Sequence, residues 1–340
     1  MKRPERSLEF TEVIITRTPY RVSLFGGGSD HPSWYRENGG EVLSFAIDKF
    51  CYLTTRVLPP FFEHNYRIAY SKVETTKTVS EIQHPAVRGA LKKYCPDKSV
   101  EIHHDGDLPA RSGVGSSSAF AVGLIHSLRL LQGKPVTPSA LANQAIDLEQ
   151  YDLGENVGSQ DQIACALGGL NHIEFGGPQE WQVSGLNIRE EYRQMIERRM
   201  VLIYTGVHRS SSDVQAGLLS NLATKSTFMY RTIELARECN LLLRSEGDLD
   251  AIGEMLIESW YLKRDLNPFA VTPALNEIWQ KSLNSGALGG KVLGAGGGGF
   301  CLFWVKDGGR DEFLRRFNLG TNVPVKIEYS GSTCIFNSDE

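Results

Sequence analysis

A run of glycines and serines at positions 108–118, Leu-Pro-Ala-Arg-Ser-Gly-Val-Gly-Ser-Ser-Ser, has the composition of a phosphate-binding loop. It lies between a β-rich segment, 99–103, and an apolar segment, 117–131, which the pattern predicts as a buried helix. The first N–H groups of a helix bind anions, and glycines let the backbone approach a phosphate closely. No Gly-Lys-Ser/Thr follows, which disfavours an ordinary P-loop. A glycine turn with a serine N-cap is the alternative reading.

Two carboxylates follow the loop at positions where they could do chemistry. Glu149 shares a helical face with Ala142, Ala145 and Ile146, and a carboxylate on an apolar face is costly unless it is paired or binds a cation. An exposed glutamate at the end of a helix is the alternative. Asp161 lies 12 residues later, just before a small apolar helix, where an N-cap is the alternative to a catalytic role.

Two further glycine clusters are present. Gly26-Gly27-Gly28 ends a predicted strand and is followed by Ser29, Asp30 and His31. The run 294–299 has β-rich, apolar flanks, which favour a tight turn between paired strands over a flexible linker.

Together these segments resemble the three motifs of the GHMP kinases, named after the galactose, homoserine, mevalonate and phosphomevalonate enzymes. The first motif matches Thr-Pro-Tyr-Arg-Val-Ser-Leu-Phe-Gly-Gly-Gly-Ser-Asp at 18–30, and the second matches Pro-Ala-Arg-Ser-Gly-Val-Gly-Ser-Ser-Ser-Ala at 109–119. The third matches Lys-Val-Leu-Gly-Ala-Gly-Gly-Gly-Gly-Phe at 291–300. They occur in the family's order. The resemblance implies an α+β fold with a ribosomal-S5-like domain, a ferredoxin-like domain and an active site between them.

The resemblance also implies roles for individual residues in ATP- and Mg²⁺-dependent phosphoryl transfer. Asp161 would take the proton of the acceptor hydroxyl, and Arg21 would lie beside the transferring group. Ser117 and Glu149 would hold Mg²⁺, a mixed oxygen set that suits this ion. The ATP phosphates would be bound by Gly113, Val114, Gly115, Ser116, Ser117 and Ser118. The third motif, with Gly294, Gly296, Gly297 and Gly298, would shape the site from the other side.

The first motif narrows the range of possible phosphoryl acceptors. Galactokinases carry Glu-His where this chain has Gly27 and Gly28, and the glycine form is similar to the kinases of fucose and of heptose 7-phosphate. Together with Tyr-Thr-Gly-Val-His-Arg-Ser at 204–210, it most resembles D-glycero-D-manno-heptose 7-phosphate kinases, which phosphorylate the anomeric hydroxyl. The predicted substrate contacts are Gly27, Gly28, Ser29, Asp30, His31 and, for the substrate's own phosphate, Arg209. Two alternatives to this function remain. The protein is a kinase of another acceptor, such as fucose or an isoprenoid precursor, or it is a catalytically silent sugar sensor. The decarboxylase of mevalonate diphosphate, which is related to these kinases, is disfavoured because the first motif is of the sugar-kinase type.

The elements that must position these residues mix helices and strands without a regular βαβ rhythm, which indicates an α+β protein. The length of 340 residues predicts two domains, which we place at 1–185 and 186–340. Predicted strands are 13–16, 21–25, 51–58, 99–103, 170–175, 198–204, 291–293 and 299–305. Predicted helices are 84–94, 117–131, 137–153, 212–243, 249–265 and 273–285.

Composition excludes several classes of function. The net charge of −4 and pI of about 6.1 give no footprint for nucleic acid or an anionic membrane. Six cysteines without a CxxC pair indicate neither zinc nor a disulfide framework. We therefore expect a cytoplasmic protein with a small-molecule sugar phosphate as its partner; the sequence does not indicate an oligomeric state.

Overall fold

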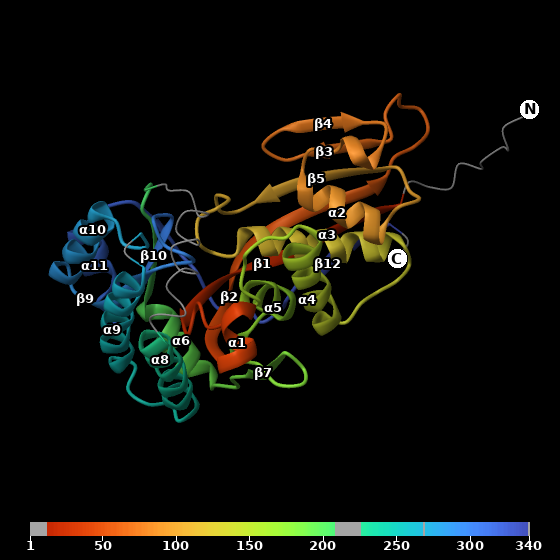
Figure 1. The fold of residues 1–340 in the computed structure, drawn as a ribbon. Coiled ribbons are helices and arrows are strands. Elements are labelled where there is room, and N and C mark those ends of the chain that lie inside the picture. The colour runs from red at the N-terminus through yellow and green to blue at the C-terminus, as the bar shows by residue number, and fades with distance from the viewer. Residues whose placement is uncertain (1–11, 208–225, 268, 339–340) are drawn as a thin grey trace, which may run out of the picture.

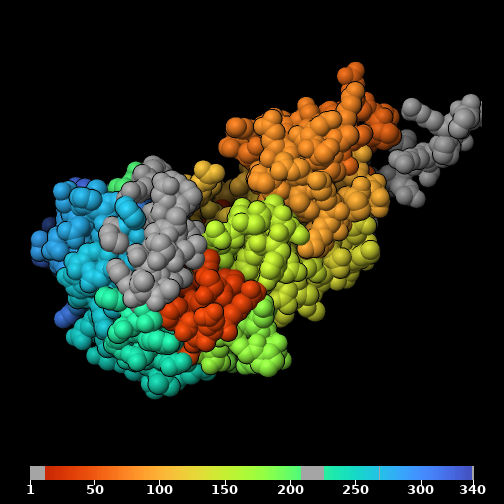
Figure 2. Space-filling model, viewed as in Figure 1, coloured from red at the N-terminus to blue at the C-terminus, as the bar shows by residue number. Residues whose placement is uncertain are grey.

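The computed structural model describes residues 12–207, 226–267 and 269–338, which form two β-sheets with helices packed on them (Figure 1). The first sheet has the order β12-β1-β2-β5-β3-β4, with β6 paired to β2 and β7 to β6. The second has the order β11-β8-β10-β9. This confirms the predicted α+β class. Strands β9 and β10 of the second sheet, with α9 to α11 (teal to blue), lie at one end of the molecule, and β3, β4 and α2 (orange) lie at the other (Figure 2).

The described strands are β1 (Val13–Phe25), β2 (Gly40–Val57), β3 (Tyr66–Ala69), β4 (Val73–Thr76), β5 (Val100–Gly106), β6 (Leu170–Phe175), β7 (Trp181–Gly185), β8 (Met200–Tyr204), β9 (Ala287–Val292), β10 (Phe300–Val305), β11 (Thr321–Val323) and β12 (Thr333–Asn337). The described helices are α1 (Pro32–Asn38), α2 (Pro85–Tyr94), α3 (Ser116–Leu131), α4 (Pro138–Asp147), α5 (Gln160–Leu167), α6 (Glu190–Arg199), α8 (Ser226–Arg244), α9 (Ala251–Leu266), α10 (Pro273–Asn284) and α11 (Arg310–Phe317).

Strands β1 and β2 form the long antiparallel pair at the centre of the first sheet. Two strands separated at Pro19 were predicted here, and this is wrong: β1 runs through the proline without a break. The register of the ladder shifts between Pro19 and Tyr20, and such irregularities tolerate a residue without an N–H. The continuous strand carries Arg21 and Ser23 on one face, two residues apart.

Helix α3 packs closely on β1 and β2. Thr16 donates a hydrogen bond of 3.1 Å to the carbonyl of Gly123, and a Cβ at Gly123 would lie 2.8 Å from the Thr18 hydroxyl. A larger residue would therefore push the helix off the strand. This contact fixes the N-terminus of α3, which begins at Ser116, relative to the strand that carries Arg21.

Helix α9 approaches the second sheet in the same way. A Cβ at Gly289 of β9 would lie 2.1 Å from the carbonyl oxygen of Gly253 in α9. Behind this contact Trp260 and Trp279 stack with their ring centroids 4.5 Å apart. The close packing fixes α9 beside β9, so that Lys263 and Lys291, one from each, face the same space.

Two elements between the sheets, β7 and α6, were not predicted. The predicted strand 198–204 begins two residues later, at Met200, because Arg198 and Arg199 form the last turn of α6. Helix α6 also has Glu190 and Glu191 in its first turn, so its charges follow a usual helix pattern. Near the end of the chain, β12 returns to the first sheet and pairs with β1. The domain boundary between 185 and 186 stays a prediction.

Among the described residues, no helix is long and apolar enough to cross a membrane. All six cysteines are free thiols, five of them buried.

Candidate active site

A cleft of about 990 Å³ is lined by residues from both sheets. It brings together most of the residues that the sequence predicted. These are Arg21, Gly27, Gly28, Asp30, His31, Gly113, Gly115, Ser116, Ser117, Ser118, Glu149, Asp161 and Gly294.

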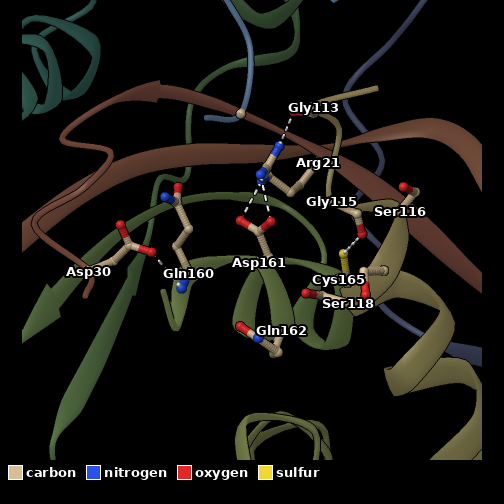
Figure 3. Close-up of polar contacts among 12 residues, drawn as sticks. Arg21, Asp30, Gly113, Gly115, Ser116, Ser118, Gln160, Asp161, Gln162 and Cys165 are labelled. Atoms are coloured by element: carbon tan, nitrogen blue, oxygen red, sulfur yellow. Dashed lines mark hydrogen bonds and ion pairs between the residues drawn. The ribbon is translucent and has the colours of Figure 1, made fainter. Parts of the chain in front are cut away.

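Arg21 and Asp161 form a bidentate ion pair in the cleft (Figure 3). Nε and Nη2 of Arg21 donate to the two carboxylate oxygens at 2.7 and 2.6 Å, and Nη1 donates to the Gly113 carbonyl at 2.6 Å. Arg21 is only 4% exposed, whereas a quarter of the Asp161 side chain is open to the cleft. Asp161 lies in the first turn of α5, whose N-cap is Ser159, so the N-cap reading of Asp161 is wrong.

The phosphate-loop residues surround the start of α3. Gly115 is its N-cap, in the left-handed region at φ 74°, and the N–H groups of Ser116, Ser117 and Ser118 have no partner within the helix. A Cβ at Gly115 would lie 3.1 Å from Cγ of Arg21 and 3.5 Å from Oδ2 of Asp161, so this backbone touches the ion pair. The structure therefore combines a free helix N-terminus and a charged pair at one point of the cleft.

The Val114 side chain is buried in the core, and its carbonyl accepts the Arg21 N–H at 3.0 Å. The Ser116 hydroxyl accepts the backbone N–H of Arg111 at 3.0 Å. Val114 thus holds the loop against β1, whereas Ser116 stabilises the loop internally.

Glu149 is 1% exposed, so the reading of an exposed helix end is wrong. It lies in a π-helical turn, Leu148–Asp152, that continues α4, a feature often found at functional sites. Ser117 donates to one carboxylate oxygen at 3.0 Å, and Ser118 and Gln162 donate to the other. Burial outweighs these hydrogen bonds and raises the pKa of Glu149 to about 7.

A divalent cation would relieve the cost of this buried carboxylate. The Ser117 hydroxyl and the Glu149 carboxylate, 3.0 Å apart and next to the free end of α3, offer hard oxygen donors of the type that Mg²⁺ prefers. These residues fit the ion that was expected from the sequence, and Ser117 and Glu149 are the side chains that would hold it.

The turn after β1 presents Asp30. Its carboxylate accepts the N–H of Gly28 at 2.9 Å and of Gln160 at 3.3 Å. Burial and the neighbouring Asp161 raise the pKa of Asp30. Ser29 does not line the cleft: its hydroxyl donates to the Gly26 carbonyl at 2.7 Å and stabilises the turn. His31 is buried, with Nε2 3.3 Å from the Asn156 carbonyl.

The third glycine cluster packs against the phosphate loop. A Cβ at Gly294 would lie 2.6 Å from Cα of Gly113, and the Phe300 N–H donates to the Ser112 carbonyl. Gly296 and Gly297 contact Ala270 instead: a Cβ at Gly296 would lie 2.6 Å from its carbonyl oxygen, and the Gly297 N–H donates to it at 2.8 Å. Gly298 lies between these two glycines and strand β10, with a φ of 156°. A structured turn, rather than a linker, is therefore confirmed.

The sequence reasoning missed two cleft lysines. Lys263 on α9 donates to the carbonyls of Val292 and Gly294 at 3.0 and 2.5 Å, and Lys291 on β9 donates to the Leu24 carbonyl at 2.8 Å. Burial lowers the pKa of Lys263 to about 8, and burial likewise lowers the pKa of Lys291 well below its usual value. Lys291 directly precedes the third glycine cluster, which was a usable signal; Lys263 has no such mark. Arg209 lies outside the described residues.

Comparison with known proteins agrees with this geometry. The model of the GHMP kinases N terminal domain matches residues 80–169, and that of the GHMP kinases C terminal domain matches residues 233–320, together just over half of the chain. The chain therefore belongs to the GHMP kinase family, whose members are ATP-dependent phosphotransferases.

Individual relatives include sugar kinases. The chain is 26% identical to the D-glycero-alpha-D-manno-heptose 7-phosphate kinase of Campylobacter jejuni, over 86% of this chain and 90% of the relative. It is 24% identical to the galactokinase of Pyrococcus furiosus, over 89% and 93%. Among solved structures, a D-glycero-D-manno-heptose 1-phosphate kinase from Bacteriodes thetaiotaomicron superposes with a TM-score of 0.78 at 25% identity, covering 95% of this chain and 99% of that one.

Replacing Gly294 with alanine should disrupt the site through one contact. The new Cβ would collide with Gly113, and we expect kcat/KM to fall at least ~10-fold because the phosphate loop shifts. Gly133→Ala is the matched control, since Gly133 has a similar φ of 64° but nothing within 4 Å of the added carbon. Both variants carry similar backbone strain, so a larger loss of thermal stability in Gly294→Ala reports the collision with Gly113. Equal activity in the two variants would contradict the role of this contact.

Glu149→Gln should stabilise the protein at high pH when divalent cations are removed. Because the pKa of Glu149 is raised above its unfolded value, its ionisation destabilises the fold as pH rises from 4.5 toward about 7, and the full penalty is present above that. We expect the variant's advantage in free energy of unfolding to grow between pH 5 and 9, to roughly 2–4 kcal/mol. Urea denaturation in EDTA measures this. A wild-type protein that is the more stable at pH 9 would contradict the burial cost.

Proposed function

We propose that the protein transfers the γ-phosphoryl group of ATP to the anomeric hydroxyl of D-glycero-D-manno-heptose 7-phosphate, giving the 1,7-bisphosphate. The observation that carries the kinase chemistry is the Arg21–Asp161 pair at the N-terminus of α3, inside a cleft. A carboxylate, a cation and a helix N-terminus provide the positioning and charge neutralisation that phosphoryl transfer requires.

In this proposal Asp161 accepts the proton of the acceptor hydroxyl as its oxygen bonds to the γ-phosphorus, and ADP leaves. Arg21 orients the Asp161 carboxylate through two hydrogen bonds and places a positive charge beside the transferring group. ATP supplies the phosphoryl group, with Mg²⁺ neutralising its charge. The N–H groups at the start of α3 would hold phosphate oxygens, and Ser117 and Glu149 would bind the ion; the free helix N-terminus and the 3.0 Å contact between these two side chains support this assignment.

The choice of acceptor rests on the turn after β1 and on the relatives. Gly27 and Gly28 carry no side chains to bind sugar hydroxyls, while Asp30 remains in the cleft for that purpose. The heptose 7-phosphate kinase of Campylobacter jejuni matches most of the chain, which supports a phosphorylated heptose. Arg209 stays a predicted contact of the substrate's own phosphate.

Fucose is the second candidate acceptor, because a bifunctional fucokinase/GDP-fucose pyrophosphorylase of Arabidopsis thaliana is 26% identical over 93% of this chain, although over only 32% of that protein. A silent sugar sensor is disfavoured, since Arg21, Ser117, Glu149 and Asp161 meet in one cleft.

Asp161→Asn should remove phosphoryl transfer and leave ATP binding. We expect kcat to fall at least ~100-fold because the general base is lost. The Kd for Mg²⁺-ATP should stay within about threefold, since the N-terminus of α3 is unchanged. Asp97→Asn, in the exposed turn after α2, is the control. Normal turnover of the Asp161 variant would remove this residue from the mechanism.

A screen of ADP release with Mg²⁺-ATP should identify the acceptor. We expect heptose 7-phosphate to give the highest kcat/KM among free and phosphorylated hexoses and heptoses and fucose. A higher kcat/KM for fucose would make fucose the acceptor and leave the proposed phosphoryl-transfer chemistry unchanged. No turnover with any sugar would favour a sensor.

A further inference from the structure

Besides the exposed Arg111, three cationic side chains line the cleft, and only one of these three has a carboxylate partner among the described residues. Asp161 pairs with Arg21, whereas within the described parts of the chain no carboxylate forms an ion pair with Lys263 or Lys291. In the described part of the chain, the recorded partners of their ammonium groups are backbone carbonyls. Buried charges without a counter-charge are costly, so this side of the cleft is suited to an anion from outside the protein.

Lys291 is the more deeply buried of the two lysines, at 7% exposure. Its pKa is lowered by burial and then by the nearby Lys263 and Arg21. Its Nζ contacts the carbonyl of Leu24, the residue that follows Ser23 in β1. Lys291 therefore reaches the end of β1 from the second sheet, next to the Gly26–Gly28 turn.

Two other polar groups at this turn are unsatisfied. Among the described residues, Oγ of Ser23 and Oε1 of Gln160 are buried without a hydrogen-bond partner, and the two side chains are 6% and 7% exposed. Figure 3 shows the Gln160 amide between Asp30 and Asp161. Buried polar atoms without partners are rare and indicate that a ligand or water completes the site.

Gly27 keeps the space between these groups open. A Cβ at position 27 would lie 3.3 Å from Oγ of Ser23 and 3.6 Å from Nε2 of Gln160. A side chain there would occupy the space that a ligand needs to reach Ser23 and Gln160. The glycine thus combines with a lysine, a hydroxyl and an amide to form a small polar subsite.

We propose that Lys291, Ser23 and Gln160 form the subsite that binds the phosphate which the acceptor sugar already carries. Ser23 lies on the same face of β1 as Arg21 and about 7 Å further along the strand. A sugar whose acceptor hydroxyl is at Asp161 therefore extends past Asp30 toward Lys291. A phosphate there receives a charge-assisted hydrogen bond from the ammonium group and hydrogen bonds from the Ser23 hydroxyl and from Nε2 of Gln160, while a hydroxyl of the sugar donates to the unsatisfied Oε1 of Gln160.

This inference rests on the proposed function, since it assigns a position to the phosphate of that substrate. Lys291→Met tests it, because methionine keeps most of the side-chain length and removes the charge. We expect KM for heptose 7-phosphate to rise roughly 10- to 100-fold, the effect of losing one charge-assisted hydrogen bond. KM for unphosphorylated heptose and for ATP should stay within about threefold. Lys306→Met, exposed after β10, is the matched control.

Two further variants keep the test independent of the folding of the first. Ser23→Ala should raise KM for the sugar phosphate selectively but by less, and Gly27→Ala should do so by filling the space between Ser23 and Gln160. Calorimetric titration of heptose 7-phosphate without ATP should show the same losses of affinity. This readout does not depend on turnover.

The outcomes separate the two proposals. Suppose that the wild type phosphorylates the sugar phosphate, but that Lys291→Met raises KM equally for the phosphorylated and the free sugar, or raises neither. The subsite is then wrong and the proposed function stands. If the wild type phosphorylates only free sugars, the phosphorylated acceptor is wrong, and the subsite falls with it.

Discussion

The structure of the cleft depends on the ion pair between Arg21 and Asp161. A guanidinium group buried in the middle of β1 needs a carboxylate, and α5 supplies it from its first turn. The third nitrogen of Arg21 binds the Gly113 carbonyl, so the same side chain also fixes the phosphate loop. Strand, helix and loop are thus aligned by one residue, and the Asp161 carboxylate, the proposed base, is oriented as a result.

Around this pair the cleft separates its remaining charges. Glu149 and Asp30 are buried carboxylates with raised pKa values, and both come from the part of the chain that builds the first sheet. Lys263 and Lys291 are buried ammonium groups with lowered pKa values, and both come from elements at the second sheet. Each side is costly without ligands, so a metal ion on one side and anions on the other would be stabilised strongly. The proposed chemistry uses both.

Much of the site could be predicted because its signals are local. The glycines at 113 and 115 and the apolar run after them indicate a helix N-terminus, and the apolar face of α4 predicts the burial of Glu149. The missed features depend on distant parts of the chain. Nothing near Lys263 distinguishes it from a solvated lysine, because its burial comes from β9. The continuity of β1 through Pro19 comes from its long pairing with β2, and β12 is a strand because β1 offers it an edge.

The return of β12 to the first sheet has a mechanical consequence. The chain passes from the first sheet to the second after β7, and it passes back after β11 along a segment bonded to β2, where Lys326 contacts Asp48 and Glu328 contacts Ala46. The two parts are therefore joined covalently at two places, and α8 adds a third, non-covalent link because it packs on β1 and β2 and also on α9. A single backbone cut in one connection would leave the two sheets covalently joined through the other.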